Sequence, residues 1–422
     1  MFKHGGDEVR GVSWSDVNGD EQPGLHLCRG QSNLLLVNDP GAFTDQTKAL
    51  GVSAGSRSAA WADYNGDDHP DLLTNNFQLF TNTGGKLRDD SKLIPAPKQR
   101  NPEGAGWIDY NGDGLLDILI TNGEHGICLY ENTGKGPNWF RDVSAQAGLG
   151  PKGIGTGNGD FIVFADFVGD GYTDFFYNLG EGILAHNEGS KSRLKRDTGT
   201  GIRLPGGSAH KRGLAFADRN NNDGTFGNVI DASGDLAKST APSFGCAWAD
   251  VNIDGFLDLF VCHTQGTSRL YLGNGNGNGK FQDVTNEAGL GELTPAYGAS
   301  FADIDDDGDL DLAVNLEGRV VLATNNMPRK SDHGPLTVNV QTRKGLVGSV
   351  LRVFDQKGRP LGMRELNGAE SCGGQTSPIG HFGLPAGPCR VSVCMSDGRV
   401  AQKTITIKPS GTSLALREQD FK

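Results

Sequence analysis

The chain has 422 residues, with 51 Asp and Glu against 39 Lys and Arg, and a formal net charge of −12. This acidity and the lack of a dense basic run argue against a nucleic acid as partner, since phosphate binding needs a basic patch. No apolar run approaches the roughly 18 residues of a membrane-spanning helix. With 64 Gly and only 4 Met, the composition favours many short strands joined by tight turns, and we predict an all-β protein.

A short motif, an aromatic residue followed two positions later by Asp, recurs between residues 14 and 303. Its seven copies are Trp14–Asp16, Trp61–Asp63, Trp107–Asp109, Phe164–Asp166, Phe216–Asp218, Trp248–Asp250 and Phe301–Asp303. Successive Asp residues are 47, 46, 57, 52, 32 and 53 residues apart, and a period of roughly 40–50 residues is typical of propeller blades. We therefore predict a seven-bladed β-propeller. The 32-residue interval before Asp250 indicates either an abbreviated blade or a count of six.

Each unit repeats the same order of strands and turns. An apolar strand such as Ile118–Ile120 follows the motif, and a polar break separates it from a second strand such as Ile127–Tyr130. A Gly-rich turn then leads to a segment like Phe140–Val143 or Phe281–Val284. Each unit thus supplies about four strands, which is enough for one twisted blade sheet.

Loops of nine residues follow the motif, and Asp109–Asp117 is the clearest example. It carries oxygen-bearing side chains at positions 1, 3, 5 and 9. Gly114 at position 6 permits the turn that lets them converge, and this donor set suits a hard cation, with calcium the natural occupant. Because the flanking residues follow strand patterns, we expect each loop at a hairpin tip that faces solvent.

Four loops keep every expected ligand. They are Asp63, Asn65, Asp67 and Asp71; Asp109, Asn111, Asp113 and Asp117; Asp250, Asn252, Asp254 and Asp258; and Asp303, Asp305, Asp307 and Asp311. The backbone carbonyls at position 7, those of His69, Leu115, Phe256 and Asp309, are expected to complete the coordination. We predict at least four calcium ions. Their predicted role is to stabilise the blades, because a catalytic metal needs an open position facing a pocket.

The other three loops are incomplete, and we predict weaker metal binding there. Their remaining ligands are Asp16, Asn18 and Asp20; Asp166, Asp170 and Asp174; and Asp218, Asn220 and Asn222. The first has Gly24 in place of the last carboxylate, and the second has Val168 at position 3.

Polar residues recur four or five positions after the end of the loops, where a strand of about 13 Å would reach the opposite end of the propeller. The predicted ligand-binding residues of this channel mouth are Asn75, Asn122, Asn178, His263 and Asn315. The alternative is that these side chains hydrogen-bond to neighbouring blade backbones. The weak catalytic candidates are His263 and, in the irregular stretch before the fifth repeat, His210 and Arg212.

The repeat ends near residue 327, and the chain divides there. We predict a propeller over 1–327, a linker over 328–335 and a small β-sandwich-like domain over 336–422. Strand patterns occur at Leu336–Val340, Val350–Phe354 and Arg390–Cys394. Cys28, Cys128 and Cys262 fall in apolar strands and are predicted to be buried free thiols. A single disulfide among Cys372, Cys389 and Cys394 is left open.

The repeats resemble FG-GAP or VCBS repeats, the integrin α-subunit type of β-propeller. The tail resembles an ASPIC/UnbV domain, since Gly348–Val350, Gln375, Ser377, His381–Leu384 and Ser396–Gly398 occur in that order. Together they resemble the cartilage acidic protein 1 family over nearly the whole chain. The resemblance implies an extracellular or periplasmic protein. Residues 1–6 lack the apolar core of a signal peptide, so a cytoplasmic location is the alternative.

Two functions remain open from the sequence. The first is a calcium-stabilised binding module that recognises a protein, glycan or small molecule at the channel mouth. The second is an enzyme, a small-molecule cyclase or hydrolase, that uses the channel or the interface with the C-terminal domain. The fold does not decide between them, because propellers host both. The oligomeric state is not predicted.

Overall fold

A computed structural model describes most of the chain. The described residues are 2–3, 9–39, 42–52, 55–150, 154, 162–177, 183–189, 194–197, 218–220, 226–228, 230–275, 279–344, 346–367, 375 and 379–422. Within them the fold is all-β, as predicted. The only helices in these ranges are short 3-10 turns: η1 (Ser91–Leu93), η2 (Gly123–His125), η4 (Ile230–Ala232), η5 (Asp235–Lys238) and η7 (Glu418–Asp420). None of the described helices is long and apolar enough to cross a membrane.

Small antiparallel sheets follow one another along residues 2–323. The first four sheets have four strands each. The first sheet is β2 (Val9–Ser15), β3 (Gly24–Arg29), β4 (Leu34–Asp39), β5 (Ala42–Asp45), and the second is β6 (Ala59–Ala62), β7 (Asp71–Thr74), β8 (Gln78–Asn82), β9 (Leu87–Asp89). The third is β10 (Ala105–Ile108), β11 (Asp117–Thr121), β12 (Ile127–Asn132), β13 (Phe140–Asp142), and the fourth is β14 (Ile162–Ala165), β15 (Asp174–Tyr177), β16 (Ile183–Asn187), β17 (Leu194–Asp197). A two-stranded sheet, β18 (Asp218–Asn220) with β19 (Phe226–Asn228), comes next. The last two are β20 (Ser243–Ala249), β21 (Asp258–His263), β22 (Arg269–Gly273), β23 (Phe281–Asp283) and β24 (Ala296–Ala302), β25 (Asp311–Leu316), β26 (Arg319–Ala323), with β1 (Phe2–Lys3) as fourth strand.

The inner strands are apolar on both faces because each sheet lies between two others. Every residue of β11 is buried. Ile118 and Ile120 belong to the core shared with the β6–β9 sheet, whereas Leu119 belongs to the core shared with the β14–β17 sheet. Burial on both faces explains why these strands read as continuous apolar runs.

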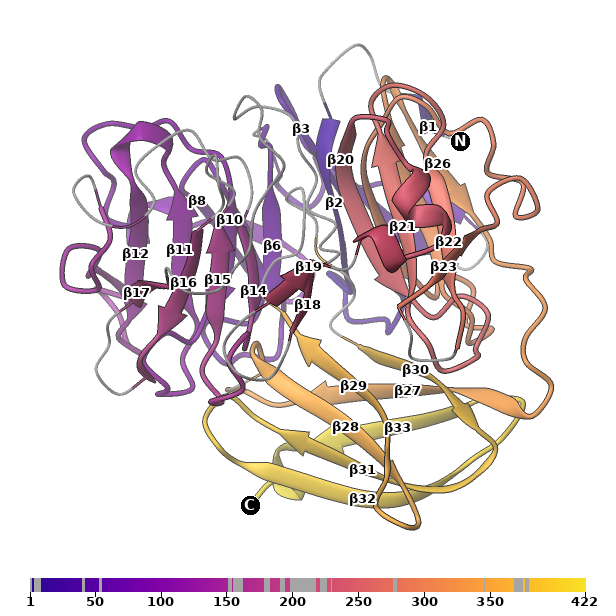
Figure 1. The fold of residues 1–422 in the computed structure, drawn as a ribbon. Coiled ribbons are helices and arrows are strands. Elements are labelled where there is room, and N and C mark those ends of the chain that lie inside the picture. The colour runs from indigo at the N-terminus through magenta and orange to yellow at the C-terminus, as the bar shows by residue number, and fades with distance from the viewer. Residues whose placement is uncertain are drawn as a thin grey trace.

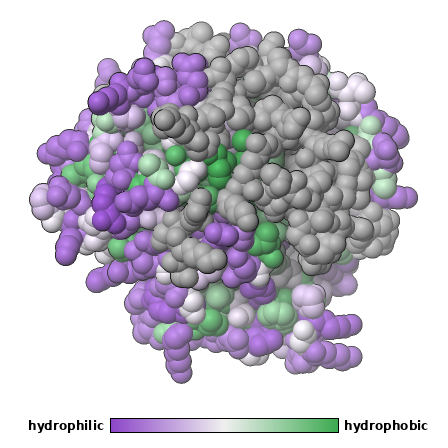
Figure 2. All heavy atoms as spheres, turned by 60° about the vertical axis from the view of Figure 1, so that its left-hand side comes forward, coloured by the Kyte–Doolittle hydropathy of each residue, from purple (hydrophilic) through white to green (hydrophobic). Residues whose placement is uncertain are grey.

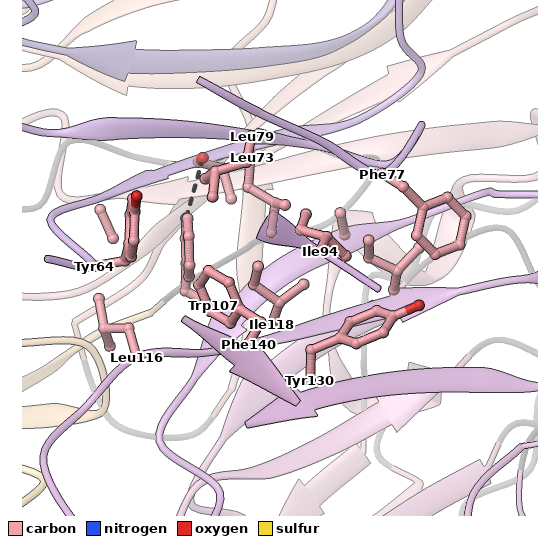
Figure 3. Close-up of a cluster of buried hydrophobic side chains, with 14 of the residues drawn as sticks. Tyr64, Leu73, Phe77, Leu79, Ile94, Trp107, Leu116, Ile118, Tyr130 and Phe140 are labelled. Atoms are coloured by element: carbon pink, nitrogen blue, oxygen red, sulfur yellow. Dashed lines mark hydrogen bonds between the residues drawn. The ribbon is translucent and has the colours of Figure 1, made fainter. Parts of the chain in front are cut away.

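Among the described aromatic residues of the repeated motif, all except Trp248 are buried in the cores between neighbouring sheets. Trp107 lies between the β6–β9 and β10–β13 sheets, where its Nε1 donates to the carbonyl of Ala60 at 3.2 Å. Its ring stacks on Tyr64 with centroids 5.9 Å apart, and Phe140 packs beside Tyr64. Figure 3 shows these rings directed into one cluster. Pairs of this kind stabilise the contact beyond the buried area alone.

The sheets close into a ring. β1 pairs with β26 in antiparallel register, so the N-terminal strand completes the sheet built from residues 296–323. The same sheet packs on the β2–β5 sheet through a core that contains Trp14, Leu25 and Ala302. Successive four-stranded sheets that pack face to face and return to the first are the architecture of a β-propeller.

Residues 333–417 form two further sheets. One has the order β30 (Gly380–Pro385), β27 (His333–Gln341), β33 (Thr412–Arg417); the other has β29 (Pro360–Leu366), β28 (Ser349–Asp355), β31 (Gly387–Cys394), β32 (Val400–Ile407). They enclose one core that includes Leu336, Leu351, Phe382 and Val393. Figure 1 places them, orange to yellow, across one end of the propeller. In Figure 2 hydrophilic side chains predominate on the described part of this region, at the bottom of the view.

Three details of the sequence-based prediction can be compared directly with these elements. The predicted strands near residues 336, 350 and 390 lie in β27, β28 and β31, but β27 begins at His333, inside the predicted linker. Cys28, Cys128 and Cys262 are free and buried, as predicted. Cys389 and Cys394 are also free, while Cys372 lies outside the described residues.

Candidate metal loops and their interface

The nine-residue loops share one backbone conformation with two left-handed residues, at positions 4 and 6. Glycine occupies both positions in the loop Asp109–Asp117, with φ of 73° at Gly112 and 78° at Gly114. Four other loops adopt the same turn with a residue other than glycine at one of the two positions. These residues are Glu21, Asp68, Ile253 and Asp306, with φ between 54° and 68°. Because a β-branched residue rarely adopts this conformation, Ile253 marks a strained position.

The Asp at position 1 organises each turn by accepting backbone N–H groups. Oδ1 of Asp109 accepts from Gly112 and Asp113 at 2.8 and 3.1 Å, and its Oδ2 accepts from Gly114 at 2.9 Å. The carboxylates of Asp16, Asp63 and Asp166 accept from the equivalent three N–H groups. The loop is thus formed by its own hydrogen bonds.

The Asp at position 9 is buried and attaches the loop to its sheet. Asp117 accepts the N–H of Tyr110 at 3.1 Å and that of Asn132 at 2.7 Å. Asp71, Asp174, Asp258 and Asp311 make the same two contacts. Burial raises the pKa of Asp71 and Asp258 to about 8, and it raises that of Asp117 as well. Such desolvated carboxylates need a positive partner.

The donor sets fit a hard divalent cation. Carboxylate oxygens of Asp303, Asp305 and Asp311 lie within 4.8 Å of one another, the one acidic or His/Cys group of this kind among the described residues. Oδ1 of Asp303 and Oδ1 of Asn252, both expected ligands, are buried and have no hydrogen-bond partner in the described structure. Side-chain and backbone oxygens without competing nitrogen or sulfur donors are the set that calcium prefers.

The incomplete loops differ from the four complete ones. In the loop that begins at Asp166, His186 takes up space against the carboxylates, with Nδ1 3.1 Å from Asp174 and Nε2 3.7 Å from Asp170. Val168 at position 3 is exposed. Asp218 and Asn220, which were predicted to lie in a hairpin-tip loop, are instead within strand β18. Asn222 lies outside the described residues.

An Asn at the end of the third strand links neighbouring sheets, a feature that the sequence reasoning missed. Nδ2 of Asn132 donates to the carbonyl of Tyr64, at loop position 2 of the preceding unit, at 3.0 Å. The same link runs from Asn38 to Ile304, Asn82 to Val17, Asn187 to Tyr110 and Asn325 to Val251. The hydrogen bond from Asn38 to Ile304 joins the first sheet to the last one, where the ring closes.

The described ones among the predicted ligand-binding residues, Asn75, Asn122, His263 and Asn315, are buried. Asn75 accepts the N–H of Arg57 and donates to the carbonyl of Pro102; Asn122 accepts from Asn101 and donates to Gln99. His263 contacts the carbonyl of Thr267 at 2.8 Å and Ser239 Oγ at 3.3 Å. These contacts match the backbone-bonding alternative.

Asn315 differs from this group, because both its side-chain polar atoms are buried and have no hydrogen-bond partner within the described structure. Asn178, His210 and Arg212 lie outside the described residues, so the structure leaves their predicted roles open.

The metal loops do not simply face solvent, as the sequence suggested. The C-terminal sheets pack on them: Ser396 Oγ donates to Asp109 Oδ2 at 3.1 Å, the N–H of Gly383 donates to Asp250 Oδ2 at 3.0 Å, and the N–H of Asp166 donates to Glu365. His381 Nε2 lies 2.9 Å from the carbonyl of Gly308, in the loop from Asp303. The hairpin tips are therefore part of an interface.

Gln375 reaches from the C-terminal segment into the centre of the ring. Its main chain accepts from Trp14 N–H at 3.3 Å and donates to the carbonyl of Val12 at 3.1 Å. Its side chain accepts from Trp61 N–H at 2.6 Å and donates back to Trp61 O at 3.0 Å. Ser300 Oγ donates to its carbonyl. One buried residue thus joins β2, β6 and β24.

In the described structure, two cavities, both larger than a third one of about 180 Å³, lie between the propeller and the C-terminal sheets. The larger, of about 900 Å³, extends beside Trp14, Trp61, Gln375 and Arg417. The smaller, of about 310 Å³, lies between Trp248 on β20 and Arg364 on β29. Concave sites at the junction of two structural units are where small ligands commonly bind.

The family comparison agrees with the repeats seen in the structure. A model described as an FG-GAP-like repeat matches residues 16–74, 109–177 and 250–314. These three stretches contain all four complete metal loops. No curated protein is significantly similar to the chain.

Solved structures with similar arrangements are distant. A BBS1N chain in complex with ARL6DN has 11% identity and a TM-score of 0.47, covering 76% of this chain and 94% of that chain. YCF48 bound to D1 peptide has 10% identity, a TM-score of 0.46 and coverage of 77% and 96%. An Agrocybe aegerita lectin that recognises terminal N-acetylglucosamine has 18% identity, a TM-score of 0.35 and coverage of 78% and 82%.

Proposed function

We propose that the chain is a calcium-stabilised, seven-bladed β-propeller that binds a protein partner at the end opposite its metal loops. In this proposal the β18–β19 sheet is part of an abbreviated blade, and residues 336–422 form an ASPIC/UnbV-type domain, as in the cartilage acidic protein 1 family. The repeated sheets, the ring closure and the FG-GAP-like match support it.

The calcium part of the proposal rests on donor chemistry. The loops from Asp63, Asp109, Asp250 and Asp303 would each hold one ion through side chains at positions 1, 3, 5 and 9 and the carbonyl at position 7. The ion supplies positive charge to buried carboxylates and ties the tip to the sheet. The residues themselves fix the turn, since positions 1 and 9 are already held by backbone N–H groups.

Coverage of the loop end by the C-terminal sheets is the observation that favours the opposite end for a partner. Ser396, Gly383 and His381 contact three different loops, so a macromolecule has access to the other rim. Exposed Arg57, Lys98 and Arg100 lie near that rim, beside Asn75 and Asn122. Loops carried by a rigid scaffold are suited to recognition.

Replacing a calcium ligand tests the metal assignment. Asp113→Ala removes an exposed position-5 carboxylate whose own contacts stay within the loop. We expect the purified protein to hold one calcium fewer per chain by atomic absorption. Chelation with EGTA should lower the melting temperature, and added calcium should restore it. The control is Asp39→Ala, an exposed carboxylate at the end of β4, and an unchanged ion count in Asp113→Ala would contradict the assignment.

Site-specific photo-crosslinking tests the protein-binding surface. A crosslinker placed at exposed Gln99, beside the uncovered rim, should capture a discrete protein in extracts of the source cells. The matched control places it at exposed Lys357, on a turn of the C-terminal sheets. The same products from both positions, or none from Gln99, would count against the proposal.

The alternative, an enzyme acting at the interface with the C-terminal sheets, is favoured by the two cavities described above. It predicts a small molecule rather than a protein as the specific partner. Native mass spectrometry of the purified chain distinguishes them, because a co-purifying compound of defined mass would support the enzyme.

A further inference from the structure

The interface cavity beside Trp248 combines three features: a cation without an ion pair among the described residues, an exposed aromatic side chain, and a ring nitrogen without a hydrogen-bond partner in the described structure. It has a volume of about 310 Å³, and Trp248, Leu257, Arg364 and His381 line it. These side chains come from β20 and its following loop on the propeller side and from β29 and β30 on the C-terminal side. None of them belongs to the predicted channel mouth or to the predicted metal ligands.

Among the described residues, Arg364 has no carboxylate partner for its guanidinium donors. Its guanidinium lies over the ring of Phe382 at 4.8 Å, and Nη1 donates to the carbonyl of Met363 at 2.8 Å. No carboxylate within the described residues forms an ion pair with it, although Asp250 acts on it at longer range. By contrast, Arg141, Arg269 and Arg359 each pair with an acid. A desolvated guanidinium is costly unless an anion meets its planar set of donors.

The apolar wall of the cavity is unusually open for such large side chains. Trp248 is 39% exposed and Leu257 is 37% exposed. An exposed indole and a guanidinium that line the same cavity suit a flat, apolar ligand group that ends in an anion.

His381 supplies a hydrogen-bond acceptor. The side chain is 6% exposed, and its Nε2 lies 2.9 Å from the carbonyl of Gly308. Because a carbonyl oxygen can only accept, Nε2 carries the proton, and the neutral ring keeps a lone pair on Nδ1. Nδ1 is buried and has no partner in the described part of the chain. A ligand hydroxyl or N–H group would satisfy it.

We propose that this cavity binds a small aromatic carboxylate that also carries a hydroxyl or N–H donor. The carboxylate accepts from Arg364, the ring lies against Trp248 and Leu257, and the donor serves Nδ1 of His381. Five acidic residues also line the cavity, namely Glu21, Asp250, Asp303, Asp306 and Glu365, and calcium in the loops from Asp250 and Asp303 would lessen the repulsion of the anion by those two loops. The site itself does not depend on the protein-binding surface proposed above.

Binding of 4-hydroxyphenylacetate to the full chain in calcium-containing buffer tests this site by titration calorimetry. We expect saturable binding with one site per chain, and binding weaker by about tenfold or more for 4-hydroxyphenylacetamide, which lacks the charge, and for phenylacetate, which lacks the hydroxyl. These comparisons need no variant. Equal affinity of the acid and its amide, or no binding of the acid, would overturn the proposal.

Two variants locate the site. Arg364→Gln should weaken binding of 4-hydroxyphenylacetate about tenfold or more. Arg390→Gln is the matched control, because Arg390 lies over Phe354 at 4.7 Å in the same way but does not line the cavity. Trp248→Ala should also weaken binding, and it stands in if Arg364→Gln fails to fold. Unchanged affinity in Arg364→Gln or Trp248→Ala would place the ligand elsewhere. Calcium content, measured separately, shows whether the loops were loaded.

Discussion

At the level of single residues, the loop aspartates divide their oxygens between two tasks. The position-1 and position-9 carboxylates already accept backbone N–H groups, as Asp109 and Asp117 do. Positions 3 and 5 accept backbone N–H groups as well, because Asn111 Oδ1 accepts from Asp113 at 3.1 Å and Asp113 Oδ1 accepts from Leu115 at 2.8 Å. All four positions of the motif therefore help to build the turn that would hold the proposed ion.

His26 illustrates a buried ionisable residue outside these loops. It lies in β3, its ring meets Trp61 edge-on at 5.7 Å, and its Nε2 has no partner within the described structure. Burial lowers the pKa of His26 from 6.5 to about 3. The folded chain therefore binds fewer protons than the unfolded chain between these values, so this residue costs stability as the pH falls below 6.5.

Replacing His26 should reduce acid sensitivity. At pH 4.5 a neutral buried histidine costs about 2–3 kcal/mol relative to neutral pH. In His26→Leu the drop in unfolding free energy between pH 7 and pH 4.5 should shrink by that amount, measured by urea denaturation at both pH values. An equal drop in both proteins would show that His26 does not contribute.

The Asn links between sheets give a second prediction at this scale. Nδ2 of Asn132 donates to the carbonyls of Tyr64 and Leu116 at 3.0 and 3.1 Å, and all three atoms lie inside the protein. Asn132→Ala should lower the free energy of unfolding by about 2–3 kcal/mol, because it leaves buried carbonyls unpaired. Asn138→Ala, at an exposed position six residues later, should be nearly neutral by the same denaturation assay. Similar effects would refute the link.

At the level of elements, the metal-loop turn has a fixed backbone and variable residues. Asp306 holds the left-handed conformation at position 4 with φ of 60°, and its side chain is exposed. Gly112 takes the equivalent place with φ of 73°, and a Cβ there would meet the Tyr172 ring at 3.1 Å. The same turn is therefore strained in one loop and relaxed in the other.

Exchanging these residue types should shift stability in opposite directions. Asp306→Gly should raise the free energy of unfolding by about 0.5–1 kcal/mol, since it relieves the left-handed backbone and removes an acid from an acidic loop. Gly112→Ala should lower it by about 1 kcal/mol or more. Thermal melts in the presence of EGTA separate these effects from metal binding. A destabilised Asp306→Gly protein would argue against strain at this position.

At the level of the whole molecule, Gln375 joins the first two sheets of the ring to the last one. In Gln375→Ala the Trp61 N–H loses its acceptor at 2.6 Å, whereas the Trp14 N–H bonds to the main chain of residue 375 and should stay protected. We expect hydrogen exchange at Trp61 to accelerate while that at Trp14 changes little. This internal comparison needs no second variant. An unchanged exchange rate at the Trp61 N–H would show that the Gln375 side chain does not stabilise β6.

The sequence predicts the blades well because their signals are local. A turn of fixed length keeps Asp at positions 1, 5 and 9 and Asn or Asp at position 3, and the strand behind it is apolar on both faces. A search for residues at fixed spacing does not find the Asn links, because the length of the second hairpin differs between units. Asn82 comes 11 residues after Asp71, but Asn132 comes 15 after Asp117. The contacts of the interface were not predictable either, since residues far apart in sequence come together there: Arg364 and Trp248 line one cavity, and Gln375 bonds to Trp61.

The bond between Gln375 and the first blades also sets an order of events in biosynthesis. Sheets β2–β5 and β6–β9 leave the ribosome early and fold as units while the rest of the chain is still being made. Their bond to residue 375 forms only after more than three hundred further residues have been added, because Gln375 and Trp61 are 314 positions apart. Until residue 375 has been added, the N–H groups of Trp14 and Trp61 lack the acceptors that it provides in the folded chain.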